Sequence, residues 1–194
     1  AGFLVQRLAD HLQAERQALA VDTRRHGDGR QARQVRRHGE DVVEIHRDGV
    51  RDLLADCGAA DTQAVQISGP SGICVPAADF DRRIAFEDLP TAGAFMIFDH
   101  SRDLFEVARN FVHFFAHESC GFCTPCRVGT SLLRNMMDKL ANGHGSPYDF
   151  AEIEKMNRIL QQMSHCGLGH SACNPVLDTI AKFRPAYEQH LKSL

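Results

Sequence analysis

The chain has 194 residues, a length that fits one large domain or two small ones. Its formal net charge is -3, so it lacks the basic surface of nucleic-acid-binding proteins, and no nucleic-acid partner is expected. No apolar run approaches the roughly 20 residues needed to cross a bilayer, so no membrane-spanning segment is predicted.

The first 41 residues change character part-way. Leu4, Leu8 and Leu12 recur at helical spacing, which predicts an amphipathic helix over residues 3–20. Residues 21–41 are rich in Arg and His and nearly lack large apolar side chains, which predicts a solvated linker. A divergent linker and an out-of-frame stretch of sequence would both give this composition. We therefore assign residues 1–41 to an N-terminal helix and an Arg/His-rich linker.

The segment 42–98 has the pattern of a small α+β module. A short helix is expected from Val50 to Ala55, ended by Gly58. Apolar residues alternate or run together between turn signals, which predicts strands over residues 42–45, 65–67, 73–75 and 94–98.

Residues 99–194 are predicted to form four amphipathic helices with short connections, and hence a small four-helix bundle in an α+β chain. Ser101 is the expected N-cap of the first helix, Asn142-Gly143 ends the second, Ser146-Pro147 and Asn174-Pro175 open the third and fourth, and Pro185 is expected to kink the last. The expected buried faces include Phe111 and Phe115, Leu132 and Leu133, Met156 and Met163, and Leu177 and Ile180.

Four cysteines have the spacing of metal ligands. Cys120, Cys123 and Cys126 are separated by two residues each, and Cys166 follows far downstream. Three thiolates in one tight segment plus a distant fourth suit a cuboidal iron–sulfur cluster, in which each iron takes one ligand. On a continuous helix the three close cysteines would point in different directions, so a loop between the first two helices is expected.

Structural zinc is the alternative for these cysteines. Zinc sites usually combine two separated Cys-x-x-Cys pairs, whereas the split here is three plus one, which favours the iron–sulfur cluster. A redox-active disulfide is a third, weaker alternative. The sequence also lacks the fourth cysteine three residues on that a bacterial ferredoxin run would have.

Residues beside the cysteines have predicted supporting roles. His117 and His165 are expected to hydrogen-bond neighbouring groups rather than to bind metal. Phe122 is expected to shield the cluster from water. Glu118, Ser119 and Arg127 either surround the ligands or serve as helix caps and surface ion pairs.

The other three cysteines, Cys57, Cys74 and Cys173, are interpreted as small buried residues, with Cys173 a remote alternative ligand. Seven cysteines with no evident pairing fit a reducing compartment, so a cytoplasmic location is predicted.

The cysteine segments also carry a family resemblance. Residues 114–130 (FFAHESCGFCTPCRVGT) and 164–169 (SHCGLG) resemble the NADH-oxidising flavoprotein subunits of respiratory complex I, and within them the diaphorase subunits of NAD-reducing [NiFe] hydrogenases. Residues 61–72 (DTQAVQISGPSG) and 83–88 (RIAFED) support the same resemblance, which extends from about Val42 to the C-terminus.

The resemblance implies a function in electron transfer. Such subunits accept a hydride from NADH on FMN and pass single electrons to a [4Fe-4S] cluster, for which Cys120, Cys123, Cys126 and Cys166 would be the ligands. It further implies a ubiquitin-like module at 42–98, a cluster-binding helical domain at 99–194, and partners in a small [2Fe-2S]-type diaphorase subunit and hydrogenase subunits. The corresponding subunits of complex I and NAD-dependent formate dehydrogenase share the cysteine segment and are the alternatives.

The sequence departs from the family in one respect. The family's flavin and nicotinamide site lies in an upstream domain with a glycine-rich loop, and this sequence has no such loop. The chain also begins with Ala1 rather than Met. We therefore expect a C-terminal part of a longer subunit that cannot oxidise NADH by itself and has no acid–base catalytic residues.

Overall fold

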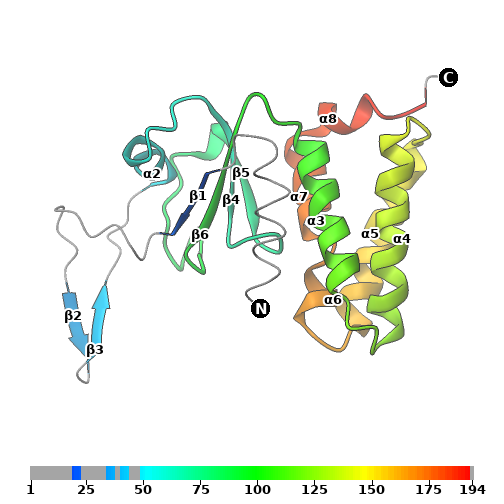
Figure 1. Cartoon of the computed structure of the whole chain (residues 1–194), viewed down its shortest axis with the longest axis horizontal. Helices are drawn as coiled ribbons and strands as arrows, with labels where there is room; N and C mark the ends of the chain where they lie inside the picture. The colour runs from blue at the N-terminus through cyan, green and yellow to red at the C-terminus, as the bar shows by residue number, and fades with distance from the viewer. Residues whose placement is uncertain (1–18, 23–33, 38–39, 44–48, 193–194) are drawn as a thin grey trace. The chain divides into compact units, whose positions relative to one another are not determined.

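The computed structural model describes residues 19–22, 34–37, 40–43 and 49–192 (Figure 1). The chain divides into two compact units. The first, which we call the sheet unit, comprises Ala1–Gly69 and Val75–His100. The second, the helical unit, comprises Pro70–Cys74 and Ser101–Leu194. No helix in the described part of the chain combines the length and the apolar composition that crossing a bilayer would need.

A four-stranded sheet in the order β1-β6-β4-β5 forms the first part of the fold. The strands are β1 (Leu19–Asp22), β4 (Thr62–Ile67), β5 (Ile73–Pro76) and β6 (Ala94–Asp99), and the short helix α2 spans Val50–Asp56. β6 pairs antiparallel with β1 on one side and β4 on the other. The strands predicted around residues 65–67, 73–75 and 94–98 and the helix at 50–55 are confirmed.

The N-terminal segment differs from the prediction. Leu19 and Ala20 belong to β1 rather than to the expected helix, whose residues 3–18 lie outside the described part. The backbone of β1 pairs with the edge of β6, and such pairing overrides local helical periodicity. The predicted linker contains β2 (Gln34–Arg37), which pairs antiparallel with β3 (Glu40–Val43). Backbone groups make this ladder, so a charged sequence does not prevent it.

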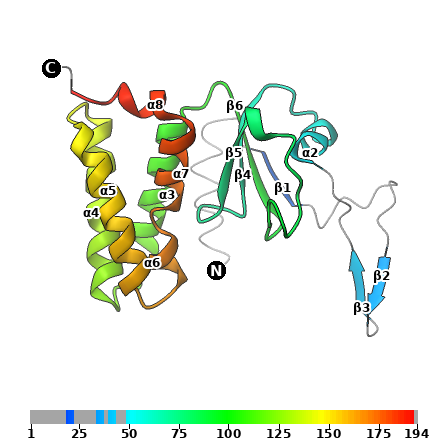
Figure 2. The same ribbon diagram turned by 180° about the vertical axis from the view of Figure 1, so that it is seen from behind.

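Four longer helices build the helical unit (Figures 1 and 2). They are α3 (Leu104–Glu118), α4 (Thr124–Ala141), α5 (Pro147–Met163) and α7 (Asn174–Lys182). Two short helices that the sequence did not predict, α6 (Gly167–Ser171) and α8 (Arg184–Glu188), complete the unit. Pro185 lies in the first turn of α8, so the chain breaks into a new helix there instead of bending α7.

Helix ends follow local capping chemistry. Ser101 is not the N-cap of α3; Asp103 is, and its Oδ1 accepts a hydrogen bond from the Phe105 N–H at 2.8 Å. This carboxylate, one residue before the helix, satisfies one of the free N–H groups at the helix start. Ser146 and Asp149 form the capping box of α5, which confirms the predicted start of that helix.

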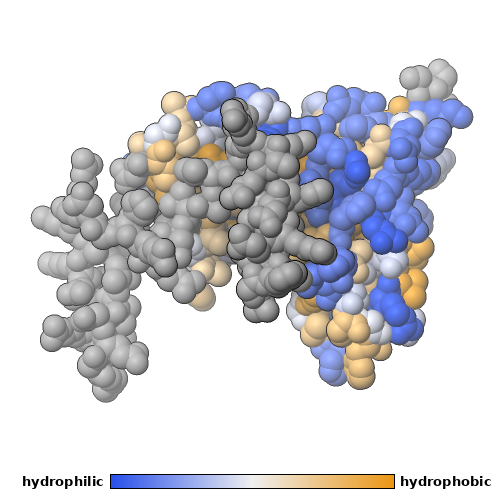
Figure 3. Space-filling model, viewed as in Figure 1, coloured by the Kyte–Doolittle hydropathy of each residue, from blue (hydrophilic) through white to orange (hydrophobic). Residues whose placement is uncertain are grey.

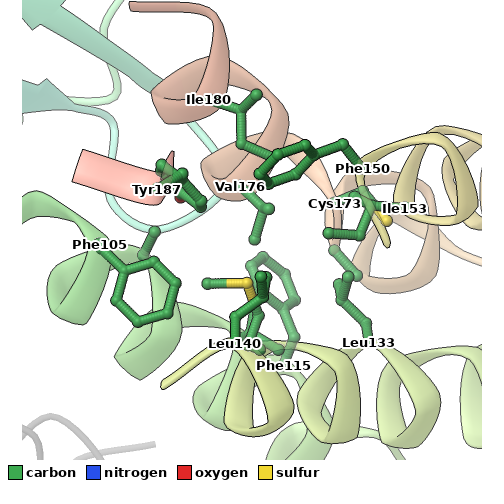
Figure 4. Packing of buried hydrophobic residues seen from close by; sticks show 14 of the residues in the cluster. Phe105, Phe115, Leu133, Leu140, Phe150, Ile153, Cys173, Val176, Ile180 and Tyr187 are labelled. Atoms are coloured by element: carbon green, nitrogen blue, oxygen red, sulfur yellow. The ribbon is translucent and has the colours of Figure 1, made fainter. Parts of the chain in front are cut away.

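The core of the helical unit lies between its four longer helices. Phe105, Phe115, Leu133 and Tyr187 are among its buried side chains, which point toward one another in Figure 4. Two predictions of burial were wrong: Leu132 is 44% exposed and Met163 is 64% exposed. Leu132 is the helical neighbour of the buried Leu133, about 100° around α4. Met163 ends α5.

The close packing of α4 on α5 depends on Gly129. A Cβ atom at this position would lie 2.8 Å from Leu160 Cδ2 and 3.2 Å from Met156 Sδ. Leu160 is fully buried, so its side chain has no free volume into which it can move. A larger residue at this position would therefore require the Leu160 and Met156 side chains to shift.

We expect Gly129→Ala to lower the free energy of unfolding by about 1–3 kcal/mol, because the added methyl group forces the helices apart. Urea denaturation followed by circular dichroism measures this change. Gly167→Ala is the control, since nothing lies within 4 Å of a Cβ atom there. Equal stability of the two variants would contradict the packing argument.

Candidate metal centre

The four cysteines predicted as ligands meet at one cavity. Cys120, Cys123, Cys126 and Cys166 line a cavity of about 340 Å³ within the helical unit. Its other lining residues are Glu118, Ser119, Phe122, His165 and Leu168. Leu168 was missed in the sequence; its position between two glycines, two residues after Cys166, was the available signal.

The three close cysteines lie where a loop becomes a helix. Cys120 is in the connection after α3, Cys123 is the N-cap of α4, and Cys126 is already in its first turn. The prediction that all three lie in a loop is therefore wrong for Cys126. Pro125 sits in the first turn of α4, where its missing N–H is not needed, and this lets the helix begin inside the motif.

The fourth cysteine lies at the start of the short helix α6. Cys166 is the N-cap of α6, which packs on α4 and α5. A Cβ atom at Gly169 would lie 2.5 Å from Ser164 Cβ and 3.2 Å from Cys126 Cβ. Both contacts involve atoms held by the backbone, so only glycine lets α6 come this close to Cys126.

The electrostatics of Cys126 reflect this convergence. Burial raises the pKa of the Cys126 thiol, the Ser119 hydroxyl opposes that change, and the charges of the other three cysteines raise the pKa further. Cys126 is thus within electrostatic reach of each of the other three cysteines. Four thiolates at this separation repel each other, and bound metal cations would offset that repulsion.

Backbone N–H groups favour the thiolate form of Cys123. The N–H of His165 and then that of Cys126 lower the pKa of the Cys123 thiol, while burial opposes them. His165 is next to Cys166 in sequence, so the segment that supplies the fourth cysteine also supplies a donor to the second. Such donors near sulfur suit an anionic iron–sulfur site.

Side chains around the cavity hold the cysteine loop. Ser119 Oγ lies 3.3 Å from Cys126 Sγ and accepts a hydrogen bond from the Gly121 N–H at 3.4 Å. Arg127 Nη1 donates to the Gly121 carbonyl at 2.6 Å. Gly121 adopts a φ of +76°, a conformation that favours glycine. Ser119 therefore lies beside a cysteine sulfur and is also the C-cap of α3, so both predicted alternatives hold for it. Arg127 contacts the backbone of the cysteine loop.

The remaining neighbours are more exposed than expected. His117 Nδ1 lies 2.7 Å from Glu118 Oε1, which fits the predicted hydrogen-bonding role. Phe122 was expected to shield the site from water, but it is 76% exposed, with its ring 5.2 Å from that of His165. Figure 3 shows apolar surface at the end of the helical unit that carries the α3–α4 connection. Phe122 contributes to the rim of the cavity without sealing it.

The residues present fit an iron–sulfur cluster. A cuboidal cluster takes one thiolate at each of four irons, so its ligands need not converge on one point. Within the described residues, no three His, Cys, Asp or Glu side chains converge on a single ion position. In the same part of the chain, the buried Ser164 hydroxyl has no hydrogen-bond partner, and it lies against Gly169 beside this site. The cavity therefore offers four soft donors, and the unpaired hydroxyl lies beside it.

Two of the remaining cysteines are buried away from the cavity. Cys173 is fully buried among Ile153, Val176 and the other core residues of the helical unit (Figure 4). Burial raises the pKa of the Cys173 thiol to about 12, and burial together with the Asp178 charge raises that of Cys74 to about 12. Their interpretation as buried residues is confirmed, whereas Cys57 is only partly buried.

Known proteins resemble the part of the chain that carries the four cysteines. Residues 106–190 match the model of a family described as the NADH-ubiquinone oxidoreductase-F iron-sulfur binding region, named for its 4Fe-4S cluster. Residues 106–190 are therefore similar to the region that this family describes. The resemblance drawn from the cysteine segments is confirmed, and the cofactor of the NADH-ubiquinone oxidoreductase-F region is a [4Fe-4S] cluster.

Relatives of the family come from hydrogenases and from NADH-quinone oxidoreductases. The chain is 41% identical over 143 residues to the NAD-reducing hydrogenase HoxS subunit alpha of Cupriavidus necator, covering 73% of this chain and 24% of that protein. It is 33% identical over 153 residues to the NADP-reducing hydrogenase subunit HndC of Solidesulfovibrio fructosivorans, covering 73% and 31%. It is 33% identical over 118 residues to an NADH-quinone oxidoreductase subunit of Mycobacterium tuberculosis, covering 58% and 26%.

A solved structure has the same fold. The crystal structure of an NAD+-reducing [NiFe]-hydrogenase in the H2-reduced state matches with a TM-score of 0.73 and 41% identity, over 77% of this chain and 27% of the matched chain. The mixed helix and sheet architecture is therefore shared with that hydrogenase chain. The chain spans between about a quarter and a third of the length of these relatives.

Buried thiols whose pKa lies far above neutral pH should resist alkylation. We expect Cys74 and Cys173 to react with iodoacetamide at pH 8 at least about tenfold more slowly than the partly exposed Cys57, because the thiolate is the reactive form. Peptide mass spectrometry of the folded chain over time measures the three rates. In concentrated urea the rates should converge; rapid labelling of Cys173 without urea would contradict its burial.

Proposed function

We propose that this chain holds a [4Fe-4S] cluster on Cys120, Cys123, Cys126 and Cys166 and transfers single electrons through it. The observation that carries the proposal is the meeting of all four thiols at one cavity, although Cys166 lies 40 positions beyond Cys126 in sequence. When bound, the cluster supplies a one-electron couple.

The residues at this site have different roles in binding the cluster. Cys126, which is 5% exposed, binds from the buried side, while Cys120 and Cys166 bind from the exposed rim. The backbone N–H groups of His165 and Cys126 stabilise negative charge on the Cys123 sulfur. The exposed side keeps the cluster accessible for electron exchange with another redox group. No bond of a substrate has to be made or broken here.

In the whole protein we propose electron relay between FMN, reduced by NADH, and clusters of partner subunits. The partners would be a small [2Fe-2S]-type diaphorase subunit and hydrogenase subunits. The choice of hydrogenase partners rests on the name of the NAD-reducing hydrogenase relative and on its 41% identity to this chain. The NADH-quinone oxidoreductase relative is 33% identical. The described residues supply the cluster site, so NADH oxidation is assigned to sequence beyond that site.

The proposed setting is the cytoplasm, because no disulfide joins the cysteines that the structure describes and thiol ligands persist in a reducing compartment. We also propose that the segment 42–98 is a ubiquitin-like module and that 99–194 is a four-helix bundle around the cluster. The antiparallel pairing of β4 and β6 and the shared core of α3, α4, α5 and α7 support this division.

The proposal predicts about four iron and four sulfide ions per chain in protein purified without oxygen. Reduction with dithionite should produce an electron paramagnetic resonance signal. We expect Cys166→Ser to lose most of the iron and this signal, because the second segment no longer closes the site. Cys173→Ala is the matched control: it removes a buried thiol outside the cavity and should retain the cluster.

Structural zinc makes the opposite prediction. One zinc ion per chain, no iron and no signal after reduction would show a redox-silent helical domain, and the electron-transfer function would be abandoned. Loss of iron in Cys173→Ala but not in Cys166→Ser would overturn the ligand assignment while leaving the cofactor in place.

A further inference from the structure

A serine hydroxyl touches the most buried of the four ligands. Ser119 Oγ lies 3.3 Å from Cys126 Sγ, within the range of a sulfur hydrogen bond. Ser119 follows the last residue of α3, and its N–H donates to the Phe115 carbonyl at 3.1 Å. The end of α3 therefore fixes the backbone from which this hydroxyl reaches the sulfur.

The surroundings determine the direction of this hydrogen bond. The Gly121 N–H donates to Ser119 Oγ at 3.4 Å, so one lone pair of the oxygen is occupied. A cysteine that binds iron has lost its proton and can only accept. Once Cys126 is a ligand, the hydrogen of the Ser119 hydroxyl must therefore point to the sulfur.

Other hydroxyls near Cys126 have different arrangements. Thr130 Oγ1 donates to the Cys126 carbonyl at 2.8 Å and is occupied within α4. Within the described residues, Ser164 Oγ is buried without a partner, and no hydrogen bond joins it to a cysteine sulfur. Ser119 thus differs from Thr130 and Ser164 in that its hydroxyl contacts a cysteine sulfur.

We propose that the Ser119 hydroxyl raises the reduction potential of the cluster through its hydrogen bond to Cys126, a role that rests on the proposed function of the four cysteines. Reduction adds one electron and breaks no bond, so the reduced state carries one more negative charge. A hydrogen-bond donor to a ligand sulfur therefore stabilises the reduced cluster more strongly than the oxidised cluster. Cys126 is buried, which weakens solvent screening and strengthens this effect.

The test is a redox titration of the whole chain with dithionite, followed by electron paramagnetic resonance. For Ser119→Ala we expect the ratio of reduced to oxidised cluster at a fixed potential to fall about tenfold, or about 59 mV for a one-electron couple. Ser119→Thr keeps a hydroxyl and should restore the ratio. Ser119→Val has the size of threonine without the donor and should behave like Ser119→Ala.

The matched control is Ser131→Ala. Ser131 Oγ donates to the Arg127 carbonyl on the exposed face of α4, so its removal should leave the potential unchanged. A potential unaltered in both Ser119→Ala and Ser119→Val, with full iron content, would overturn the proposal. Loss of the cluster in these two variants but not in Ser119→Thr would also overturn it, since the hydroxyl would then retain the cluster rather than tune it. Absence of iron from the unaltered chain would instead reject the proposed function.

Discussion

The contact between the start of α6 and the first turn of α4 is the constraint on which the cysteine site depends. Gly169 allows this contact, because a side chain there would collide with Ser164 and Cys126. Without it Cys166 could not reach the three cysteines that lie 40 or more positions earlier in the chain. The rest of the helical unit serves this contact: α5 packs on α4 through Gly129 and carries the chain back toward α6.

Bringing four thiols together has an electrostatic cost that the fold distributes unevenly. Burial and neighbouring charges raise the pKa of Cys126, whereas two backbone N–H groups lower that of Cys123. The site therefore combines one sulfur in a dry environment with others near water. In this arrangement the negative charge of the thiolates would attract the metal cations of a cluster, while the exposed side of the cluster would remain open to electron exchange.

Local signals predicted most of the helical unit because helix capping and amphipathic periodicity act over a few residues. The start of α5 at Ser146-Pro147 and the end of α4 at Asn142-Gly143 follow from such signals. The errors arose where tertiary contacts determine the structure. Leu19 belongs to the strand β1 and not to the predicted helix, because it pairs with β6. The helix α6 was not predicted, because its five residues are too few to show a helical periodicity. Leu132 and Met163 were misassigned because a sequence shows apolar character but not which apolar residues the neighbouring helices cover.

The sequence by itself showed the family resemblance and predicted the four cysteines as ligands of an iron–sulfur cluster. It could do so because cysteine spacing is a local property that can be read without knowledge of the fold. It also anticipated Ser119 and Arg127 near the ligands. Only the tertiary structure decided that Cys166 reaches the other three cysteines, that Cys126 is the buried one among them, and that the Ser119 hydroxyl contacts its sulfur. These features depend on distances between segments remote in sequence, which helix packing sets and no local pattern encodes.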